Sequence, residues 1–167
     1  MSKILLQLLD TPAGEQFDRQ VRSYTQYMSR EVLKFPELIE NIKKMGEDTR
    51  QFEHYSIYMK WGIRKLEYSF ILDNLVPKEG LKVLDVGSGV TILPHIISRM
   101  GCKVDALDPD PGWKLATTKI GQLYNSFYDS DVSYINDYVF SIQGNELYDR
   151  VVSVSVLEHL PRREIGR

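Results

Sequence analysis

The most informative segment for the fold is Leu81-Lys82-Val83-Leu84-Asp85-Val86-Gly87-Ser88-Gly89. A short apolar run rich in branched residues, followed at once by two glycines, predicts a buried strand that enters a tight turn. Gly87 and Gly89 have no Cβ, so the backbone can turn sharply there and approach a ligand closely. The N–H groups at the start of the following helix would then point at that ligand.

Downstream of this stretch, helical and strand patterns alternate. We expect helices over 91–100 and 113–128, and strands over 103–107, 132–135 and 150–156. Short apolar strands separated by helices of this length are typical of a parallel sheet with crossover helices. The fold class predicted is therefore α/β, with a Rossmann-like parallel sheet.

Upstream of Pro77 the apolar spacing is helical. One helix is expected around Phe17 to Met28, and Pro36 is expected to open a second, short helix that Gly46 closes. A third helix should begin at Asp48 or Thr49 and run without a break to Leu75.

Two consequences follow from this helical pattern. The third helix should pack Tyr55, Tyr58, Leu66 and Phe70 against the sheet. The chain divides into an N-terminal helical cap, 1–76, and a partial Rossmann-like domain, 77–167.

Composition limits the classes of function. Of 167 residues, 21 are Lys or Arg and 23 are Asp or Glu, so the net charge of −2 offers no one-signed surface for nucleic acid. Cys102 is the only cysteine, which rules out an intrachain disulfide and fits a cytoplasmic location. No apolar stretch approaches 18 residues, so no membrane span is expected. The three histidines have no metal-ligand spacing, and no metal site is expected.

Three acidic residues stand where three predicted strands end: Asp85, Asp108 and Asp137. Ligands of open parallel sheets bind beyond these carboxyl ends. Asp85 is expected to accept hydrogen bonds from loop N–H groups and to affect a ligand indirectly. Asp108, after the second strand, suits a ribose diol but could also cap a strand end. Asp137 could accept from an exocyclic amine, although Asn136-Asp137 is also an ordinary turn signal.

Four segments together resemble the first four motifs of class I S-adenosylmethionine-dependent methyltransferases. They are Val83-Leu84-Asp85-Val86-Gly87-Ser88-Gly89, Val104-Asp105-Ala106-Leu107-Asp108, Asn136-Asp137, and 148–161, which begins Tyr148-Asp149-Arg150. The resemblance covers about half of the chain, and it is specific because four motifs agree in order and spacing.

The resemblance implies S-adenosylmethionine as cofactor and assigns roles to residues. The loop Gly87-Ser88-Gly89 would pass under the methionine part, Asp108 would hold the ribose hydroxyls, and Asp137 would reach the adenine amine. Pro109 and Tyr138 would lie against the adenine, and Ser153 would face the methionine end through its backbone.

The sequence departs from the family at one glycine. Thr91 stands where the family often has a third glycine, so a close approach of the backbone to a ligand is less supported at this position. The position of Ile92 argues against a nicotinamide enzyme, since that fingerprint requires glycine at this point.

The candidates for other roles are fewer. Tyr58 and Arg64 in the N-terminal helices are candidates for contacting the methionine carboxylate or the acceptor. His159 could act as a general base, but packing or capping is the more ordinary role. The catalytic residue therefore stays unknown at this level.

The expected function is methyl transfer to a small-molecule or protein acceptor. The alternative is a cofactor-binding or interaction module without turnover. The family's sheet has seven strands and this chain ends soon after the fourth, so we expect a fragment of a longer enzyme, or a homo-oligomer that pairs through the strand at 151–156.

Overall fold

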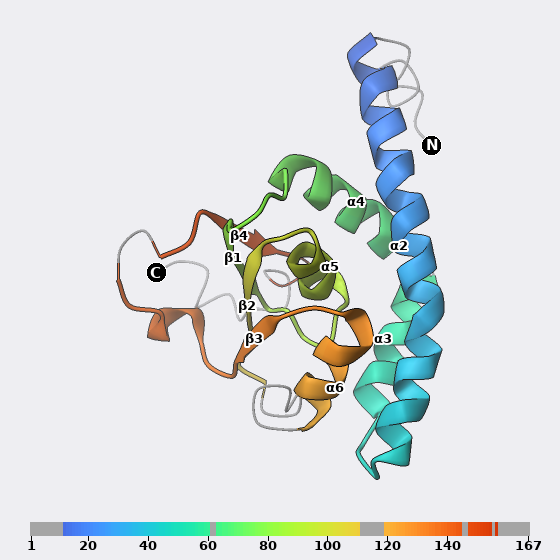
Figure 1. Ribbon diagram of the computed structural model, residues 1–167, viewed down its shortest axis with the longest axis vertical. Coiled ribbons are helices and arrows are strands. Elements are labelled where there is room, and N and C mark those ends of the chain that lie inside the picture. The colour runs from blue at the N-terminus through green and yellow to red at the C-terminus, as the bar shows by residue number, and fades with distance from the viewer. Residues whose placement is uncertain (1–11, 61–62, 111–118, 145–146, 155, 157–167) are drawn as a thin grey trace.

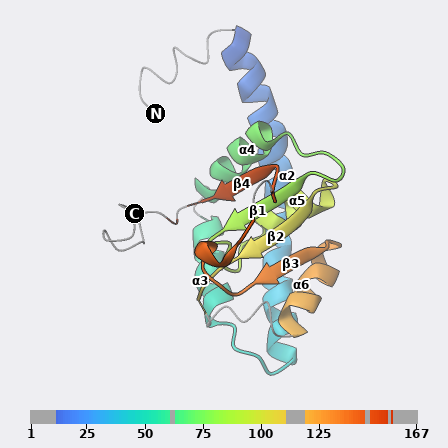
Figure 2. The same ribbon diagram turned by 90° about the vertical axis from the view of Figure 1, so that its left-hand side faces the viewer.

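Four parallel strands form the sheet, in the order β3-β2-β1-β4 (Figures 1 and 2). The computed structural model describes residues 12–60, 63–110, 119–144, 147–154 and 156. The strands are β1 (Lys82–Val86), β2 (Lys103–Leu107), β3 (Val132–Ile135) and β4 (Arg150–Ser153). The predicted α/β class with a parallel sheet is confirmed.

The strand bounds agree closely with the sequence pattern. β2 and β3 have the predicted bounds, β1 begins one residue later than expected, and β4 ends at Ser153 rather than at residue 156. Val83 lies beside Val104, which lies beside Val132, so one row of valines crosses three strands. Because all pairs are parallel, the carboxyl ends of the strands meet at one edge, and the predicted site residues gather there.

Helices connect the strands as the pattern requires. α5 (Leu93–Arg99) lies between β1 and β2, with Pro94 in its first turn, where the missing N–H costs no helical bond. α6 (Lys119–Tyr128) lies between β2 and β3, and the earlier part of its predicted range falls outside the described residues. Within the described part of the connection from β3 to β4 there is only a 3-10 turn, Val139–Ser141.

A single long helix, α2 (Pro12–Lys44), replaces the two helices predicted before Gly46. Pro36 lies inside it, so the expectation that this proline opens a new helix is wrong. Phe35, Leu38 and Ile42 around the proline are buried, and their packing outweighs the cost of the lost backbone hydrogen bond. Figure 1 shows α2 running along the whole side of the molecule.

The predicted third helix is two helices, α3 (Arg50–Lys60) and α4 (Ile63–Leu75). The Asp48 carboxylate accepts from the Arg50 N–H over 3.0 Å, which supports the predicted start. Leu66 and Phe70, expected on the sheet, are instead 57% and 53% exposed. The prediction assumed one continuous helix with a single buried face. Because α3 and α4 are separate helices, each has its own buried face. On α4 that face is Tyr68, Leu72 and Leu75.

One hydrophobic core joins the N-terminal helices to the sheet and its crossover helices. The ring centroid of Phe35 on α2 lies 6.4 Å from that of Tyr124 on α6, and the ring centroid of Phe52 on α3 lies 6.2 Å from that of Tyr124. The predicted cap and the predicted sheet domain are therefore distinct in sequence but share one hydrophobic core.

β4 lies at an edge of the described sheet and pairs with β1. Val151 is 64% exposed, whereas Val152 on the opposite face is buried. One face of this edge strand therefore exposes an apolar side chain, and edge strands with apolar side chains are the kind that pair with a further strand.

Candidate functional site

The glycine loop after β1 is held by the end of β2. Gly87 and Gly89 have φ values of +72° and +51°, which explains why glycine stands at both positions. The N–H groups of Gly87 and Ser88 donate to the Leu107 carbonyl over 2.8 and 3.2 Å. The Gly89 N–H donates to Asp108 Oδ2 over 3.0 Å. The first two sequence motifs therefore form one hydrogen-bonded unit.

The close approach at Gly87 is made by the chain itself. A Cβ at this position would collide with the side chain of Val156, which follows β4. The sequence predicted that the missing Cβ would make room for a ligand, and at Gly87 the described structure gives this room to Val156. Ser88 and Gly89, the other two residues of the loop, are buried.

Asp108 retains hydrogen-bonding capacity after serving the loop. Its Oδ2 accepts from Gly89 and its Oδ1 accepts from the Asp110 N–H over 2.9 Å. Each carboxylate oxygen can accept two hydrogen bonds, so one position on each is left for a ligand. Partial burial raises the pKa of Asp108, and the two backbone N–H groups oppose that shift. The geometry suits two neighbouring hydroxyl groups.

The segment after β3 is tied to the same edge. Asn136 Nδ2 donates to the carbonyl oxygens of Asp108 and Asp110 over 2.8 and 3.2 Å. Asp137 is exposed, and its Oδ1 accepts from the Tyr138 N–H over 2.7 Å. Tyr138 is 61% exposed. The three predicted motifs thus converge, with Asp137, Tyr138 and Pro109 on the solvent side of the edge.

Asp85 occupies a different environment from the one expected. Its side chain is 2% exposed, and Oδ2 has no hydrogen-bond partner. The loop N–H groups of Gly87, Ser88 and Gly89 donate to Leu107 and Asp108 instead. Burial, and secondarily the charge of Asp108, raises the pKa of Asp85 to about 7. Asp85 was predicted to accept hydrogen bonds from loop N–H groups, but the N–H groups of Gly87, Ser88 and Gly89 do not donate to it.

The N-terminal helices add a buried polar pair to the core. The hydroxyls of Tyr55 and Tyr68 lie 2.8 Å apart, and burial raises the pKa of Tyr68 to about 12. The charge of Arg64 lowers the pKa of Tyr68, and the charge of Asp85 raises it. Arg64 forms an ion pair with Glu67 over 2.8 Å. Sequence analysis did not single out Tyr68; its only signal was its place in an aromatic helix.

Other predicted residues are less informative. Tyr58 belongs to α3, but its side chain lies outside the described structure, as does His159. Ser153 ends β4 beside Val86 and is exposed.

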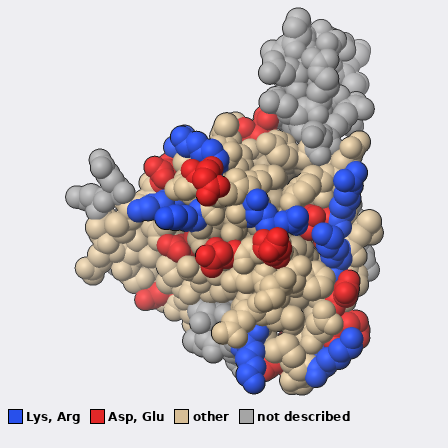
Figure 3. Space-filling model, viewed as in Figure 1, with Lys and Arg blue, Asp and Glu red and all other residues tan. Residues whose placement is uncertain are grey.

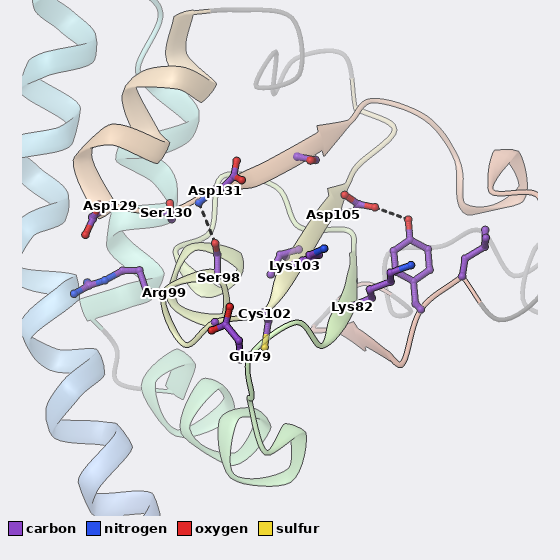
Figure 4. Close-up of a pocket in the computed structure, with 15 residues that line it drawn as sticks. Glu79, Lys82, Ser98, Arg99, Cys102, Lys103, Asp105, Asp129, Ser130 and Asp131 are labelled. Atoms are coloured by element: carbon purple, nitrogen blue, oxygen red, sulfur yellow. Dashed lines mark hydrogen bonds between the residues drawn. The ribbon is translucent and has the colours of Figure 1, made fainter.

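A hollow lies at the end of the sheet opposite to the glycine loop (Figure 4), with a volume of about 890 Å³. Lys82 and Lys103 begin adjacent strands there, and Asp105 accepts from the Tyr148 hydroxyl over 2.7 Å. None of the predicted cofactor residues lines it.

The surface and the described helices add three findings. Figure 3 shows acidic and basic side chains interspersed on the face in view. Within the described residues, no group of three His, Cys, Asp or Glu side chains could hold a metal ion. No helix in the same part of the chain combines the length and apolar character needed to cross a bilayer.

Comparison with known proteins gives partial matches to one kind of enzyme. The chain is 33% identical over 85 residues to the ubiquinone biosynthesis O-methyltransferase of Paramagnetospirillum magneticum, a match that covers 51% of this chain and 32% of that protein. It is 31% identical over 115 residues to the mitochondrial ubiquinone biosynthesis O-methyltransferase of Mus musculus, covering 60% of this chain and 30% of the relative. The corresponding protein of Methylocella silvestris is 28% identical over 85 residues, covering 50% of this chain and 32% of the relative. No family model matches the chain.

These matches span about a third of the relatives' length. They support methyltransferases as the class to which this α/β chain is related, in agreement with the motif resemblance.

Proposed function

We propose that this chain is the S-adenosylmethionine-binding part of an O-methyltransferase. The observation that carries the proposal is the joined edge of β1 and β2, where Gly89 and Asp110 donate to the two carboxylate oxygens of Asp108. This arrangement holds the carboxylate rigidly and leaves acceptor positions for a ribose diol.

The residues present fit the cofactor on chemical grounds. Asp108 would accept from the ribose hydroxyls, and the exposed Asp137 and Tyr138 would lie beside the adenine. The unpartnered oxygen of Asp85 offers an acceptor toward the cationic amino-acid end. Ser88 and Gly89 supply the backbone of the loop between these two ends.

When bound, S-adenosylmethionine supplies a methyl group on a positively charged sulfur. It would give this methyl group to an acceptor oxygen and leave as the neutral thioether, with the acceptor's proton passing to solvent, while Asp108, Ser88 and Gly89 would hold it in place. The described residues contribute binding and orientation, which supply much of the rate of such displacements. The names of the relatives support oxygen as the acceptor atom and an acceptor in ubiquinone biosynthesis.

Calorimetry with the full chain tests this proposal. S-adenosylmethionine and S-adenosylhomocysteine should bind, NAD should not, and Asp108→Ala should weaken the binding of both sulfur ligands. Absence of binding by either sulfur ligand at millimolar concentration would overturn the proposal.

The second candidate is a binding module without turnover, since the site residues named above would bind and orient a cofactor and none of them takes part in the transfer itself. Transfer of a radiolabelled methyl group to a phenolic acceptor distinguishes the two. Binding without transfer to any oxygen acceptor supports the module, whereas transfer that requires Asp108 supports the enzyme.

We also propose that Arg64 acts on the amino-acid end of the cofactor from α4. Its positive charge, which acts on Tyr68 together with the charge of Asp85, supports this role. An Arg64→Ala variant should bind S-adenosylmethionine more weakly, with Glu67→Gln as the control for loss of the ion pair alone. Equal affinity in wild type and Arg64→Ala would remove the proposal.

A further inference from the structure

Three buried tyrosine hydroxyls bond to the segment 90–92, which directly follows the glycine loop. They belong to Tyr55 of α3, Tyr68 of α4 and Tyr124 of α6, which we term the tyrosine cluster. A buried hydroxyl is costly unless it forms a hydrogen bond, and a phenylalanine ring would fill the same space without that cost. The three hydroxyls therefore require partners, and these partners lie on one short stretch of chain.

Tyr124 holds the backbone next to the last glycine of the loop. Its hydroxyl donates to the Val90 carbonyl over 2.7 Å, and both residues are buried. The residue before Val90 is Gly89, whose N–H donates to Asp108 Oδ2. The end of the loop is thus fixed through the Gly89 N–H by β2 and through the Val90 carbonyl by α6.

The hydroxyls of Tyr55 and Tyr68, 2.8 Å apart, serve the next two residues. Burial raises the pKa of Tyr55 well above its usual value, and a hydrogen bond with the Ile92 backbone lowers it in part. Burial raises the pKa of Tyr68 to about 12, and hydrogen bonds with Tyr55 and with the Thr91 side chain lower it in part. Ile92 precedes α5, whose start has no side-chain cap, so Tyr55 supplies a partner where a helix start needs one.

Thr91 is the residue at which the sequence departs from the glycine pattern of the methyltransferase motif. Its N–H donates to the Ser88 carbonyl over 3.2 Å, so it also closes the turn of the loop. A glycine in its place would have no side chain to bond to the Tyr68 hydroxyl. The departure from the pattern therefore coincides with a hydrogen bond between the loop segment and α4.

Aromatic packing fixes the rings that carry these hydroxyls. Phe35 of α2 packs edge-to-face on Tyr55, with ring centroids 5.3 Å apart. The rings of Phe35 and Phe52 also pack on Tyr124. Since a close-packed core leaves little room for rings to shift, the packing of α2 and α3 determines where the hydroxyls lie.

We propose that the tyrosine cluster positions the glycine loop for its ligand, so that the N-terminal helices control ligand affinity through residues 90–92. The three tyrosines are positioning residues. This inference rests on the proposed function, which supplies the ligand. Loss of one hydroxyl leaves a buried group of the segment without its partner, so the free loop would populate other conformations that binding must reverse.

The experiment compares Tyr124→Phe with Tyr128→Phe in the full chain. Both tyrosines are buried on α6 and donate to a backbone carbonyl, but Tyr128 donates to Glu31 of α2 over 3.4 Å. In the ligand-free protein, amide hydrogen exchange over 87–92 should be at least about fivefold faster in Tyr124→Phe and unchanged in Tyr128→Phe. By calorimetry, S-adenosylhomocysteine should bind roughly threefold to tenfold more weakly to Tyr124→Phe and normally to Tyr128→Phe.

A second pair of variants tests the bond to α4 without altering the aromatic core. Thr91→Val removes the hydroxyl at nearly constant side-chain volume, whereas Thr91→Ser keeps it. Thr91→Val should reproduce Tyr68→Phe in both exchange and affinity, and Thr91→Ser should behave as the wild type. The double variant of Thr91→Val and Tyr68→Phe should bind about as well as either single variant, since both remove the same hydrogen bond.

The outcomes separate the inference from the proposed function. Wild-type exchange over 87–92 in Tyr124→Phe and Thr91→Val, or faster exchange with unchanged affinity, overturns the inference and leaves the proposed function standing. Equal losses of affinity in Tyr124→Phe and Tyr128→Phe also overturn it, because a general weakening of the core then explains the effect. If the wild type binds neither sulfur ligand, the proposed function fails, and exchange alone decides whether the cluster holds the loop. If Tyr124→Phe does not fold, the two Thr91 variants decide.

Discussion

The backbone N–H of Gly89 donates to Asp108 Oδ2 over 3.0 Å, and this single bond joins the glycine loop to the acid that ends the second strand. The two residues are 19 positions apart in the chain and belong to different motifs. Because of this contact, the binding of the ligand that we propose for Asp108 would also depend on the position of the loop. A change at either residue should therefore affect both stability and ligand affinity.

Asp108→Asn should remove one of the two hydrogen bonds that the Asp108 carboxylate accepts from the backbone N–H groups of Gly89 and Asp110. An amide has one oxygen, so it can accept from Gly89 or Asp110 but not from both in the present geometry. We expect a loss of about 1 kcal/mol in unfolding free energy and at least a tenfold loss in S-adenosylmethionine affinity. Chemical denaturation and calorimetry measure the two effects, and unchanged affinity would contradict the role given to Asp108.

Gly87→Ala should destabilise the protein by roughly 1–3 kcal/mol, since the new methyl group would meet Val156 at a positive φ. Gly46→Ala is a matched control, because Gly46 has a φ of +78° and no atom within 4 Å of the added Cβ. Gly46→Ala should lose only the free energy needed to hold alanine at a positive φ, about 1 kcal/mol. Adding Val156→Ala to Gly87→Ala should recover only the part due to the collision. Equal losses at Gly46 and Gly87 would show that Val156 does not restrict the loop.

Asp85→Asn should change the pH dependence of stability. The pKa of Asp85 is raised from 3.8 to about 7 in the folded protein, so the folded state binds the proton more tightly than the unfolded state. The resulting stabilisation is complete below pH 3.8 and disappears as pH rises through about 7, at up to about 1.4 kcal/mol per pH unit. Denaturation between pH 4 and 8 should show that the variant lacks this fall. A profile identical to that of the wild type would contradict the raised pKa.

His95 should have the opposite effect. It is fully buried, with Nδ1 at 2.8 Å from Ser130 Oγ and Nε2 at 2.9 Å from the Tyr134 hydroxyl. Burial lowers its pKa from 6.5 to about 3, so its stabilisation is present above pH 6.5 and is lost as pH falls toward 3. Between pH 4 and 6.5 the contributions of His95 and Asp85 thus oppose each other. His95→Gln should expose the falling slope of Asp85, and Asp85→Asn the rising slope of His95; parallel profiles in the two variants would refute this.

Glu31 should be the most sensitive ion-pair position among those described. It is buried on α2 and pairs with Lys34 and with Arg99 of α5, each over 3.0 Å. We expect Glu31→Gln to cost about 1–3 kcal/mol, since it leaves two cations without their partner. Glu40→Gln, in the exposed pair with Lys43, should cost less than about 0.5 kcal/mol. A double-mutant cycle between Glu31 and Arg99 should give a coupling energy well above that of the exposed pair Glu40–Lys43. A coupling energy of zero would contradict a stabilising ion pair between α2 and α5.

The sheet could be predicted closely because its signals are local. Lys103–Leu107 and Val132–Ile135 were predicted with the bounds observed, since each is a short branched run between turn residues. The helices were harder. Pro36 carries a strong local signal for a helix start, and the burial of Phe35 and Leu38 on either side of it overrides that signal.

The α/β class, the order of the motifs and the acids at the strand ends could all be predicted from the sequence, because strand periodicity and turn chemistry depend on neighbouring residues. The contacts of each acid and glycine depend instead on tertiary packing. Val156 fills the space beside Gly87, Tyr68 rather than Phe70 is buried, and the loop donates to Asp108 rather than to Asp85. These contacts join segments far apart in the chain, and side chains packed from several elements fix them together.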